Sequence, residues 1–433
     1  MKAVILAGGK GTRLGSLTAD MPKPLIAVGG KSILEHQILL LKKYGITDII
    51  ILTGHLGDQI ARYVGDGSRW GVSITYIQES ESQGTAGALR ALPERIKEDF
   101  LLLSGDVMAH FNVQRFLNWH NSRTQAVATV IVHPSNHPMD SDLVEVDADM
   151  KIINLLRRPH SPELLFRNLG IASMYIMTPA FFSYIPQYGK CDIERDVFPR
   201  VLVGSGALYA YQTPEYLRDM GTPDRLGRVR KDYSAGTIAA QSFETKRPAI
   251  FLDRDGVINK GGNGVTRLED MELYEEAKQA ICRINSSLFL SIVVTNQPVL
   301  AKGLLSEEGL YQIHKKMETE LGKAGAAVDA IYYCPHHPKR GFEGEIAELK
   351  IICGCRKPEI GLLTRATEEF NIDLTRSVFI GDSTADAKAA ENAGIRFIGV
   401  KTGNGLQDGT YELAHTPHVV PTIADAVDQV LML

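Results

Sequence analysis

Short apolar runs alternate with helix-like patterns along the first half of the chain. Ser32 and Glu35 stand three residues apart before apolar residues at helical spacing, and Gly45 follows the end of that pattern, which is typical of a capped helix. Apolar runs that predict buried strands occupy residues 3–6, 49–52, 72–77 and 100–103. Strands that alternate with helices favour a mostly parallel, doubly wound α/β sheet.

The same alternation begins again in the second half. Runs that predict strands occupy residues 249–252, 289–294, 378–380 and 397–400. Ser306, followed by two glutamates, begins a helix that ends near Gly322. The residues between the two patterns are polar, mixed in charge and without a strand pattern. We therefore predict two doubly wound α/β domains, at residues 1–228 and 247–433, joined by a linker at 229–246.

Composition narrows the class of protein without pointing to one activity. The 433 residues are 44% apolar and 23% charged, and the net charge of −4 gives no reason to expect a nucleic acid or a membrane as partner. The N-terminal apolar run is too short and too rich in glycine for a signal peptide, and no stretch approaches the roughly 18 apolar residues of a membrane span. We expect a cytoplasmic protein, and the oligomeric state, a homo-oligomer included, stays open.

A glycine-rich turn directly follows the first predicted strand. Its glycines let the backbone approach phosphate oxygens and donate N–H groups to them, and Arg13 adds a guanidinium for the same oxygens. The next motif, Met-Pro-Lys-Pro-Leu, is stiffened by its prolines and presents Lys23. The nucleotide-binding residues expected in the turn are Gly8, Gly9, Gly11 and Thr12.

Together, the motifs Gly-Gly-x-Gly-Thr-Arg-Leu and Pro-Lys-Pro-Leu resemble the signature of sugar-1-phosphate nucleotidyltransferases, which have a Rossmann-like fold of the GT-A type. The resemblance implies that Arg13 holds the leaving pyrophosphate and that Lys23 holds the attacking sugar phosphate. It further implies that Asp106, in Leu-Ser-Gly-Asp, and Asp219, in Arg-Asp-Met-Gly-Thr-Pro, bind one Mg²⁺ at the α-phosphate. The sugar phosphate then displaces pyrophosphate in line, without a covalent intermediate.

The same resemblance assigns residues to the base and to the sugar. The segment Gln-Gly-Thr-Ala-Gly-Ala-Leu at 83–89 resembles the base-binding loop of the family. Where relatives carry Glu-Lys-Pro, this chain has Arg157, Arg158 and Pro159, and Arg158 can still pair with a phosphate. The residues implied for base and sugar binding are Gly84, Thr85, Asn168, Gly170, Glu194 and Arg158.

One residue bears on the identity of the base. Glu79 stands five residues before Gly84, where uridylyl- and thymidylyltransferase relatives tend to carry glutamine. A carboxylate only accepts hydrogen bonds, and guanine offers two donors at N1–H and its exocyclic amine, so Glu79 favours GTP. The alternative is a solvated carboxylate in the run from Glu79 to Glu81 that binds no base.

In the second half, Phe-Leu-Asp-Arg-Asp-Gly ends a predicted strand and resembles the first motif of haloacid-dehalogenase-type (HAD) phosphatases. The resemblance implies that Asp253 attacks phosphorus to form a phosphoaspartate, while Asp255 protonates the leaving alkoxide and then activates water. Thr295 and Asn296 supply the second motif, Lys357 the third, and Asp382 the fourth with the supporting Asp386. The residues implied for Mg²⁺ are Asp253, Asp255 and Asp382.

Cysteine usage points to a second metal. The five cysteines are odd in number, with three close together, which favours a reducing compartment and a metal site over disulfides. Two segments, one Cys-Pro-His and one Cys-Gly-Cys, each place two candidate ligands at positions i and i+2, on the same side of an extended strand. His336 is preferred over His337 because it keeps that spacing. The predicted structural Zn²⁺ ligands are Cys334, His336, Cys353 and Cys355.

The zinc loop resembles two kinds of phosphatase, those for D,D-heptose 1,7-bisphosphate and those for histidinol phosphate. Arg356 and Lys357 could hold a second phosphate, which suits a bisphosphate, although Pro298, Val299 and Lys302 stand where heptose relatives tend to have Ser-Gly and Arg. Removing the 7-phosphate of a heptose 1,7-bisphosphate leaves a sugar 1-phosphate, the kind of substrate that the first domain uses. The sequence therefore favours two consecutive steps toward a GDP-heptose for lipopolysaccharide or S-layer glycans.

Two alternatives stay open from the sequence. The first domain could use mannose 1-phosphate or another hexose 1-phosphate, joined to a histidinol-phosphate-type or broader phosphatase. In a different class, one head could be inactive and serve as a regulatory binding module. The intact carboxylates argue against this second alternative; they are Asp106, Asp219, Asp253, Asp255 and Asp382.

Overall fold

The computed structural model describes residues 1–9, 11–261 and 264–432. The chain divides into two compact units. The first comprises Met1–His133, Val144–Leu156 and Ile171–Glu244, and the second comprises Pro134–Leu143, Arg157–Gly170 and Thr245–Leu433. Two short segments from the first half of the sequence are therefore part of the second unit.

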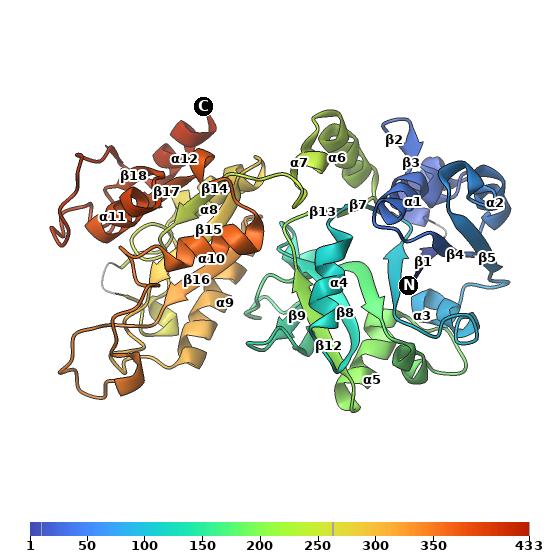
Figure 1. The fold of residues 1–433 in the computed structure, drawn as a ribbon, viewed down its shortest axis with the longest axis horizontal. Coiled ribbons are helices and arrows are strands. Elements are labelled where there is room, and N and C mark those ends of the chain that lie inside the picture. Colours follow the sequence, from blue (N-terminus) through green and yellow to red (C-terminus); the bar gives the residue numbers. More distant parts are fainter. Residues whose placement is uncertain (10, 262–263, 433) are drawn as a thin grey trace. The chain divides into compact units, whose positions relative to one another are not determined.

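The first unit is built on a mixed nine-stranded sheet within the described residues (Figure 1). Its strands are β1 (Lys2–Ala7), β4 (Asp48–Thr53), β5 (Ser73–Gln78), β6 (Phe100–Ser104), β8 (Ala126–His133), β9 (Leu143–Val146), β10 (Ile152–Leu156), β11 (Gly170–Met177) and β12 (Ala207–Gln212). The main path runs β10-β9-β11-β6-β1-β4-β5, and β8 pairs with both β11 and β12. The four predicted strand runs overlap β1, β4, β5 and β6, which are parallel to one another, whereas β11 is antiparallel to β6.

Helices and two small ladders complete the first unit. The helices are α1 (Ile33–Lys43), α2 (Gly57–Val64), α3 (Gly84–Gly87), α4 (Val113–Asn121), α5 (Phe198–Val203), α6 (Pro223–Ser234) and α7 (Thr237–Ala240). The ladders pair β2 (Ala27–Val28) with β3 (Lys31–Ser32), and β7 (Val107–His110) with β13 (Tyr216–Asp219). As predicted, Ser32 caps α1 by accepting from the Glu35 N–H, at 3.1 Å between Oγ and N. Gly45 follows α1 with a φ of 74°, which favours glycine.

Residues 229–246, expected to form a linker, contain the C-terminal half of α6 and all of α7. Although most of these residues are polar, a few apolar side chains in and next to this segment are buried. Leu226, Val229 and Ile238 pack in a small core together with Met220. The first unit consequently extends to Glu244.

In the described part of the second unit, a parallel six-stranded sheet has helices packed along it (Figure 1). The strand order is β16 (Ala330–Cys334), β15 (Leu290–Asn296), β14 (Ala249–Leu252), β17 (Val378–Gly381), β18 (Arg396–Val400) and β19 (Val419–Val420). The helices are α8 (Glu275–Asn285), α9 (Glu307–Lys323), α10 (Gly361–Phe370), α11 (Thr384–Ala393) and α12 (Ile423–Leu431). Side chains alternate across the sheet: Ile250 and Leu252 join the core that α8 and α12 cover, and Phe251 stacks on Phe379. The prediction of two α/β folds is confirmed.

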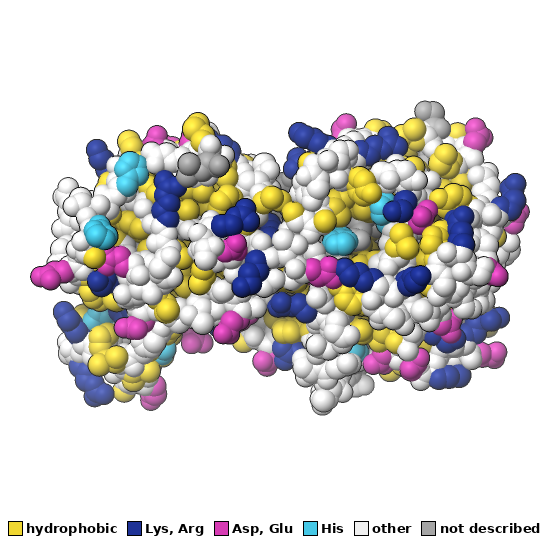
Figure 2. Space-filling view, turned by 45° about the horizontal axis from the view of Figure 1, so that its top comes forward, with side chains coloured by type: hydrophobic (Ala, Val, Ile, Leu, Met, Phe, Trp, Pro, Cys, Tyr) yellow, Lys and Arg dark blue, Asp and Glu magenta, His cyan; other side chains and the backbone are white. Residues whose placement is uncertain are grey.

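The charged side chains of the surface are mixed in sign. Lys and Arg side chains alternate with Asp and Glu on the face that Figure 2 shows, in keeping with the small net charge. None of the helices among the described residues is long and apolar enough to cross a membrane.

Candidate active sites and metal centre

The glycine-rich turn of the first unit leaves the carboxyl end of β1, the edge at which α/β sheets of this kind bind ligands. Gly11 has a φ of 63°, and its carbonyl accepts from the Leu14 N–H at 2.9 Å. A Cβ added to Gly8 would lie 3.0 Å from the Glu79 carboxylate and 3.4 Å from the nitrogen of Gly54. The structure therefore places Glu79 directly against the turn. Gly9 and Thr12 lie in the same turn.

Two carboxylates meet beside this turn through the β7–β13 ladder. Asp219 is opposite Val107 in the ladder, and the Met220 N–H donates to the carbonyl of Asp106 at 3.1 Å. The backbone thus places Asp106 and Asp219 on adjacent chain segments. Carboxylate oxygens are the protein ligands that Mg²⁺ prefers, so this pair is chemically suited to hold it.

Cations surround these two carboxylates. The buried Lys23 forms an ion pair with Asp106, which also accepts from Ser104 Oγ at 2.7 Å. The Arg13 guanidinium lies against Gly221, where an added Cβ would be 3.1 Å from Nη2. Residues predicted from separate motifs, Arg13 and Lys23 with the two aspartates, are therefore gathered in one place.

A third cation at this site was not among the predicted residues. Arg225 Nη1 donates to Asp219 Oδ2 at 2.5 Å, and the Gly221 N–H donates to Oδ1 at 2.7 Å. Burial raises the pKa of Asp219, but these hydrogen bonds and the charges of Arg225 and Lys23 outweigh burial, so the pKa lies below its ordinary value. Asp219 is consequently ionised at neutral pH. The only signal for Arg225 was its place six residues after Asp219 in the Gly-Thr-Pro-Asp-Arg run.

The predicted base-binding loop is tied to the segment that carries Glu194. Gly84 has a φ of 81°, and an added Cβ would lie 2.4 Å from the Cys191 carbonyl oxygen. The Thr85 N–H donates to Asp192 at 3.0 Å, and Thr85 Oγ1 accepts from the Ile193 N–H at 2.9 Å. Glu194 itself accepts from the Tyr175 hydroxyl. The base loop and this predicted sugar-binding residue are therefore neighbours.

The remaining predicted sugar residues have other contacts. Both atoms of the Asn168 amide bond the backbone of Ser135, at 2.9 and 2.7 Å, and the side chain is buried. Gly170 pairs with Leu143 in the β9–β11 ladder. Arg158 is exposed and donates to the Asp140 carbonyl at 2.7 Å. None of the contacts described for these three residues connects them to the aspartate pair.

In the second unit, three aspartates lie close together at the carboxyl ends of β14 and β17, and a lysine pairs with two of them. Carboxylate oxygens of Asp253, Asp382 and Asp386 lie within 4.8 Å of one another. Lys357 Nζ is 2.9 Å from Asp253, 2.6 Å from Asp386 and 2.8 Å from the carbonyl oxygen of Val294. All-carboxylate oxygen chemistry fits a hard divalent cation such as Mg²⁺.

Burial dominates the electrostatics of this group. It raises the pKa of Asp253 to about 7, against the opposing charge of Lys357, and raises the pKa of Asp382 to about 8 with help from the charges of Asp253 and Asp386. The pKa of Lys357 is raised because the charges of the two aspartates outweigh its burial. Without a cation, full ionisation of the three carboxylates is therefore unfavourable, and the group retains protons near neutral pH.

Asp255 lies outside the group of three aspartates, although the sequence predicts it as a Mg²⁺ ligand as well as the general acid and base. Its carboxylate accepts from Gln297 Nε2 at 2.8 Å and from Asn259 Nδ2 at 3.0 Å. Arg254, which is completely buried, adds bonds of 2.9 Å to both oxygens. This clamp of hydrogen bonds holds the Asp255 carboxylate in one orientation. A group that donates and accepts protons in a reaction requires such a fixed orientation. Arg254 stands between the two aspartates in sequence, which is the only signal that could have identified it.

The other predicted residues line the same region. Thr295 Oγ1 is 3.0 Å from Gln297 Nε2, and Thr295 is buried at the end of β15. Asn296 exchanges hydrogen bonds with the backbone of Lys357, at 3.0 and 3.1 Å. Arg356 donates to the His336 carbonyl at 3.2 Å, so it joins the segment that carries Lys357 to the cysteine-rich loop.

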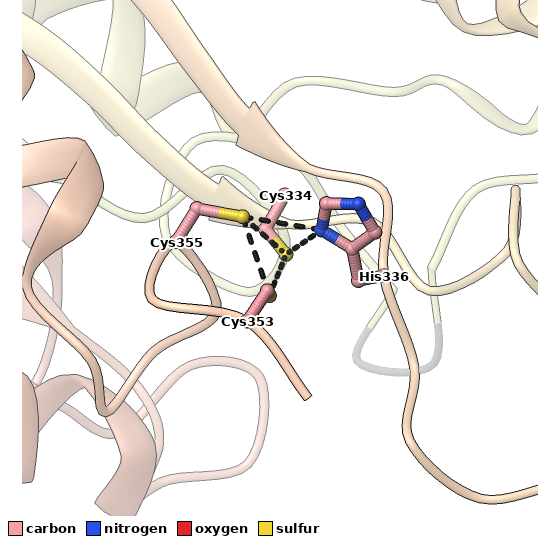
Figure 3. Close-up of side chains that lie close together, drawn as sticks. All are labelled: Cys334, His336, Cys353 and Cys355. Carbon is pink, nitrogen blue, oxygen red and sulfur yellow. Dashed lines mark hydrogen bonds between the residues drawn. The ribbon is translucent and has the colours of Figure 1, made fainter. Parts of the chain in front are cut away.

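Three cysteines and one histidine form the candidate metal centre (Figure 3). The Sγ atoms of Cys334, Cys353 and Cys355 are 3.2 to 3.6 Å apart, and Cys355 Sγ is 3.2 Å from His336 Nδ1. Disulfide sulfurs are about 2.0 Å apart, whereas the edge of a zinc–thiolate tetrahedron is roughly 3.8 Å. The spacing therefore fits a tetrahedral metal site. His337 faces elsewhere and contacts the Lys339 carbonyl at 3.2 Å.

Comparison with known proteins finds different families for the two halves of the chain. A family model described as nucleotidyl transferase matches residues 2–236, and one described as HAD-hydrolase-like matches residues 354–426. The chain is 28% identical to a mannose-1-phosphate guanylyltransferase of Mycobacterium tuberculosis, over 60% of this chain and 72% of that protein. It is 38% identical to a D-glycero-beta-D-manno-heptose-1,7-bisphosphate 7-phosphatase of Vibrio cholerae, over 39% of this chain and 89% of that protein.

A solved structure resembles the second half. It is a D,D-heptose 1,7-bisphosphate phosphatase from B. bronchiseptica, complexed with magnesium and phosphate. The identity is 33% over 43% of this chain and 98% of that chain, with a TM-score of 0.38.

These matches define a fusion of two enzymes, a nucleotidyltransferase and a HAD-type phosphatase. The chain belongs to the nucleotidyl transferase family through more than half of its length, and its other half belongs to the family of the heptose 1,7-bisphosphate phosphatases.

Proposed function

We propose that this chain catalyses two consecutive steps. The phosphatase half removes the 7-phosphate of D-glycero-D-manno-heptose 1,7-bisphosphate, and the other half transfers GMP from GTP to the heptose 1-phosphate, releasing pyrophosphate. The observation that carries the proposal is the union of these two families in one chain. The product of a 7-phosphatase is a sugar 1-phosphate, which is the acceptor class of a sugar-1-phosphate nucleotidyltransferase. A heptose activated in this way would serve lipopolysaccharide or S-layer glycan synthesis.

Phosphate removal begins with Asp253. Its carboxylate attacks phosphorus, the bond to the sugar oxygen breaks, and a phosphoaspartate forms. Asp255 gives its proton to the leaving oxygen and then takes one from the water that hydrolyses the intermediate. The clamp of Arg254 and Gln297 on Asp255 supports this role, because it holds the carboxylate in one orientation. Asp253 and Asp382, supported by Asp386, would hold a Mg²⁺ that supplies positive charge to the phosphoryl oxygens.

Nucleotidyl transfer needs positioning rather than a covalent step. Lys23 would orient the sugar phosphate for in-line attack on the α-phosphate, and Arg13 would stabilise the departing pyrophosphate. Asp106 and Asp219 would hold a Mg²⁺ that neutralises phosphate charge. The juxtaposition of these four residues across the β7–β13 ladder supports the assignment.

GTP is proposed as the nucleotide on two grounds. Glu79 lies against the glycine-rich turn, where its acceptor oxygens suit the donor edge of guanine. The mycobacterial relative is named as a guanylyltransferase. That name also favours a second candidate, in which mannose 1-phosphate replaces the heptose 1-phosphate as acceptor.

The cysteine-rich loop is proposed to hold a structural Zn²⁺. Four protein ligands close a tetrahedral site and leave no position for a substrate. The bond from Arg356 to the His336 carbonyl links this loop to Lys357, so the metal would order a segment next to the phosphatase site.

One experiment tests both steps. The purified chain is given heptose 1,7-bisphosphate, GTP and Mg²⁺, and phosphate and pyrophosphate are followed separately. We expect phosphate to appear first and pyrophosphate after a lag, because the second step needs the product of the first. Pyrophosphate release from mannose 1-phosphate with equal efficiency would favour the second candidate. Failure to release phosphate from the bisphosphate would contradict the heptose assignment.

A further inference from the structure

The two aspartates of the nucleotidyltransferase site each have a cation of their own. Lys23 pairs with Asp106, and Arg225 pairs with Asp219. Lys23 precedes the sheet ladder that positions the aspartates, whereas Arg225 extends from the first turn of α6, just after Asp219 in sequence. Two independent elements of the fold therefore bring positive charge to the oxygens that would bind a divalent cation.

The Arg225–Asp219 pair is not needed to hold the fold together. Asp219 is already oriented by the Gly221 N–H and by the β7–β13 ladder. The side chains of Arg225 and Asp219 are 30% and 37% exposed, and a pair so open to water contributes little to the free energy of folding. Another arginine of α6, Arg228, has a structural partner in the buried Asp232, at 3.0 Å. Arg225 is thus available for a different partner.

Charge balance shows what that partner would be. Arg13, Lys23 and Arg225 carry three positive charges beside two carboxylates. When a divalent cation occupies the carboxylates, Lys23 and Arg225 lose their present partners, and the site becomes strongly positive. Phosphate oxygens are the groups that restore the balance, and the planar fork of a guanidinium matches them in two parallel hydrogen bonds.

We propose that Arg225 is a phosphate-binding residue of the nucleotidyl transfer site, which leaves Asp219 for a phosphate group of the substrates when a divalent cation binds the aspartates. The inference rests on the proposed function of this site. The shared chemistry is a phosphate group, and its source is either the nucleoside triphosphate, with pyrophosphate as its product, or the sugar 1-phosphate. The two sources differ in which kinetic constant depends on Arg225.

The kinetic test uses the full-length chain with Arg225→Ala and Arg225→Lys. Arg230→Ala is the matched control, because Arg230 is exposed on the same helix and contacts the Ala27 carbonyl instead. Steady-state rates are measured with GTP and sugar 1-phosphate varied in turn, together with inhibition by pyrophosphate. We expect Arg225→Ala to raise one KM by roughly tenfold to a hundredfold, and Arg225→Lys to recover part of the loss. A parallel rise of the GTP KM and the pyrophosphate inhibition constant identifies the triphosphate as the source, and a rise of the sugar-phosphate KM alone identifies the sugar phosphate.

A second measurement reports on the metal without turnover. In a full-length Asp382→Asn background, which removes a carboxylate of the phosphatase metal group, Mn²⁺ binding is followed by electron paramagnetic resonance in the absence of nucleotide. Arg225→Ala should tighten Mn²⁺ binding by about twofold to fivefold, because a competing cation has left Asp219. Thermal unfolding of the first unit in the single Arg225→Ala variant serves as the folding control.

The outcomes separate this inference from the proposed function. Absence of nucleotidyl transfer in the wild-type chain with every sugar 1-phosphate and triphosphate tried would reject the proposed function itself. An active wild type whose KM values and pyrophosphate inhibition are unchanged by Arg225→Ala would overturn the phosphate-binding role. Unchanged or weaker Mn²⁺ binding in Arg225→Ala would overturn the exchange between carboxylate and phosphate.

Discussion

The two active sites treat their carboxylates in opposite ways. In the first unit, the side chains of Asp106 and Asp219 are 31% and 37% exposed, and each has a separate cation. In the second unit, Asp382 and Asp386 are 1% and 0% exposed, and Asp386 shares Lys357 with Asp253. The pKa of Asp219 is lowered, whereas those of Asp253 and Asp382 are raised. The surroundings therefore favour the ionised form of aspartate in the first site and disfavour it in the second.

The difference follows from the chemistry proposed for each site. Nucleotidyl transfer brings two phosphorylated substrates together, so its cations must move between carboxylates and phosphates, and an open site allows this. A phosphatase that uses a carboxylate as nucleophile needs one fixed geometry, which burial and the shared lysine provide. That rigidity concentrates negative charge, which a bound cation or protonation relieves. Four predictions test the comparison, in order of decreasing expected effect.

The largest effect is expected from Asp253→Asn. An amide cannot act as the nucleophile, so phosphate release should fall by on the order of a thousandfold or more. Nucleotidyl transfer to a ready-made sugar 1-phosphate should stay close to wild type, because the residues proposed for its phosphates and its metal belong to the other unit. Separate assays of phosphate and pyrophosphate check both statements. The reciprocal variant Asp106→Asn should show the reverse pattern, and loss of both activities in a folded Asp253→Asn protein would refute two independent sites.

The second prediction concerns the metal of the cysteine-rich loop. The purified chain should contain about one zinc per chain, and Cys353→Ser should lose most of it, because three ligands bind zinc far less tightly than four. Metal analysis measures the content, and thermal unfolding should show the second unit destabilised. Cys282→Ser is the matched control, since Cys282 lies outside the cluster and contacts the Ala324 carbonyl. Undiminished zinc in Cys353→Ser would show that the ligands have been assigned wrongly.

The third prediction uses the raised pKa values of the buried aspartates. In the folded state Asp253 and Asp382 titrate near 7 and 8, against an ordinary value of 3.8, so the folded chain binds more protons than the unfolded chain between these limits. Stability is therefore lost as pH rises from the ordinary value toward 7 and 8, and the loss levels off above the higher of these two pKa values. Without added Mg²⁺, the melting temperature of the second unit should fall by roughly 5–10 °C between pH 6 and pH 8.5.

Magnesium and a neutral variant sharpen that test. Mg²⁺ should reverse the loss and stabilise more at pH 8.5 than at pH 6, and Asp382→Asn should reduce both the loss and the response to Mg²⁺. Burial also raises the pKa of Glu215 in the first unit to about 7, so that unit should lose stability as well, but Mg²⁺ should not restore it. A second unit whose unfolding is indifferent to pH and to Mg²⁺ would contradict the contrast between the sites.

Much of the fold could be predicted because parallel strands buried on both faces are continuous apolar runs. All eight predicted runs overlap observed strands, and the cap at Ser32 follows from local hydrogen bonding. The antiparallel additions to the first sheet and the helices α6 and α7 were missed. Val229 and Ile238 lie in a largely polar sequence, and only their packing against residues distant in sequence, such as Met108, reveals a helix.

Some residues of the candidate sites could likewise be predicted from the sequence, and others could not. The four residues of the candidate metal centre could be predicted because spacing at i and i+2 is a local property, and the structure brings all four together. Arg225 and Arg254 could not, because an arginine close to an aspartate in sequence is common and its partner depends on the tertiary fold. Asn168 illustrates the converse. Its amide matches a family motif, yet its described hydrogen bonds go to the backbone of Ser135.

The smallest effect concerns the base, and it depends on what Glu79 does at the glycine-rich turn. Its carboxylate is half-buried, and burial raises its pKa although the Gln83 N–H donates to Oε1 at 3.3 Å. This bond favours a loop-stabilising carboxylate, whereas the proximity to Gly8 favours a role in nucleotide binding. The two roles give different results when the charge is removed at constant size.

Glu79→Gln replaces one acceptor oxygen with a donor. If Glu79 accepts from guanine N1–H and the exocyclic amine, a donor then faces donors, at a cost of about 1–3 kcal/mol, or roughly tenfold to a hundredfold in kcat/KM with GTP. Preference should shift toward UTP or dTTP, whose edges combine a donor with acceptors. Competition between GTP and UTP for one sugar 1-phosphate measures the shift, with phosphatase activity as the control. If Glu79 only stabilises the loop through Gln83, both nucleotides should lose efficiency equally, because Oε1 of glutamine still accepts that bond but holds it less strongly. If the ratio of kcat/KM with GTP to kcat/KM with UTP does not change, the guanylyl assignment is supported by the relatives alone.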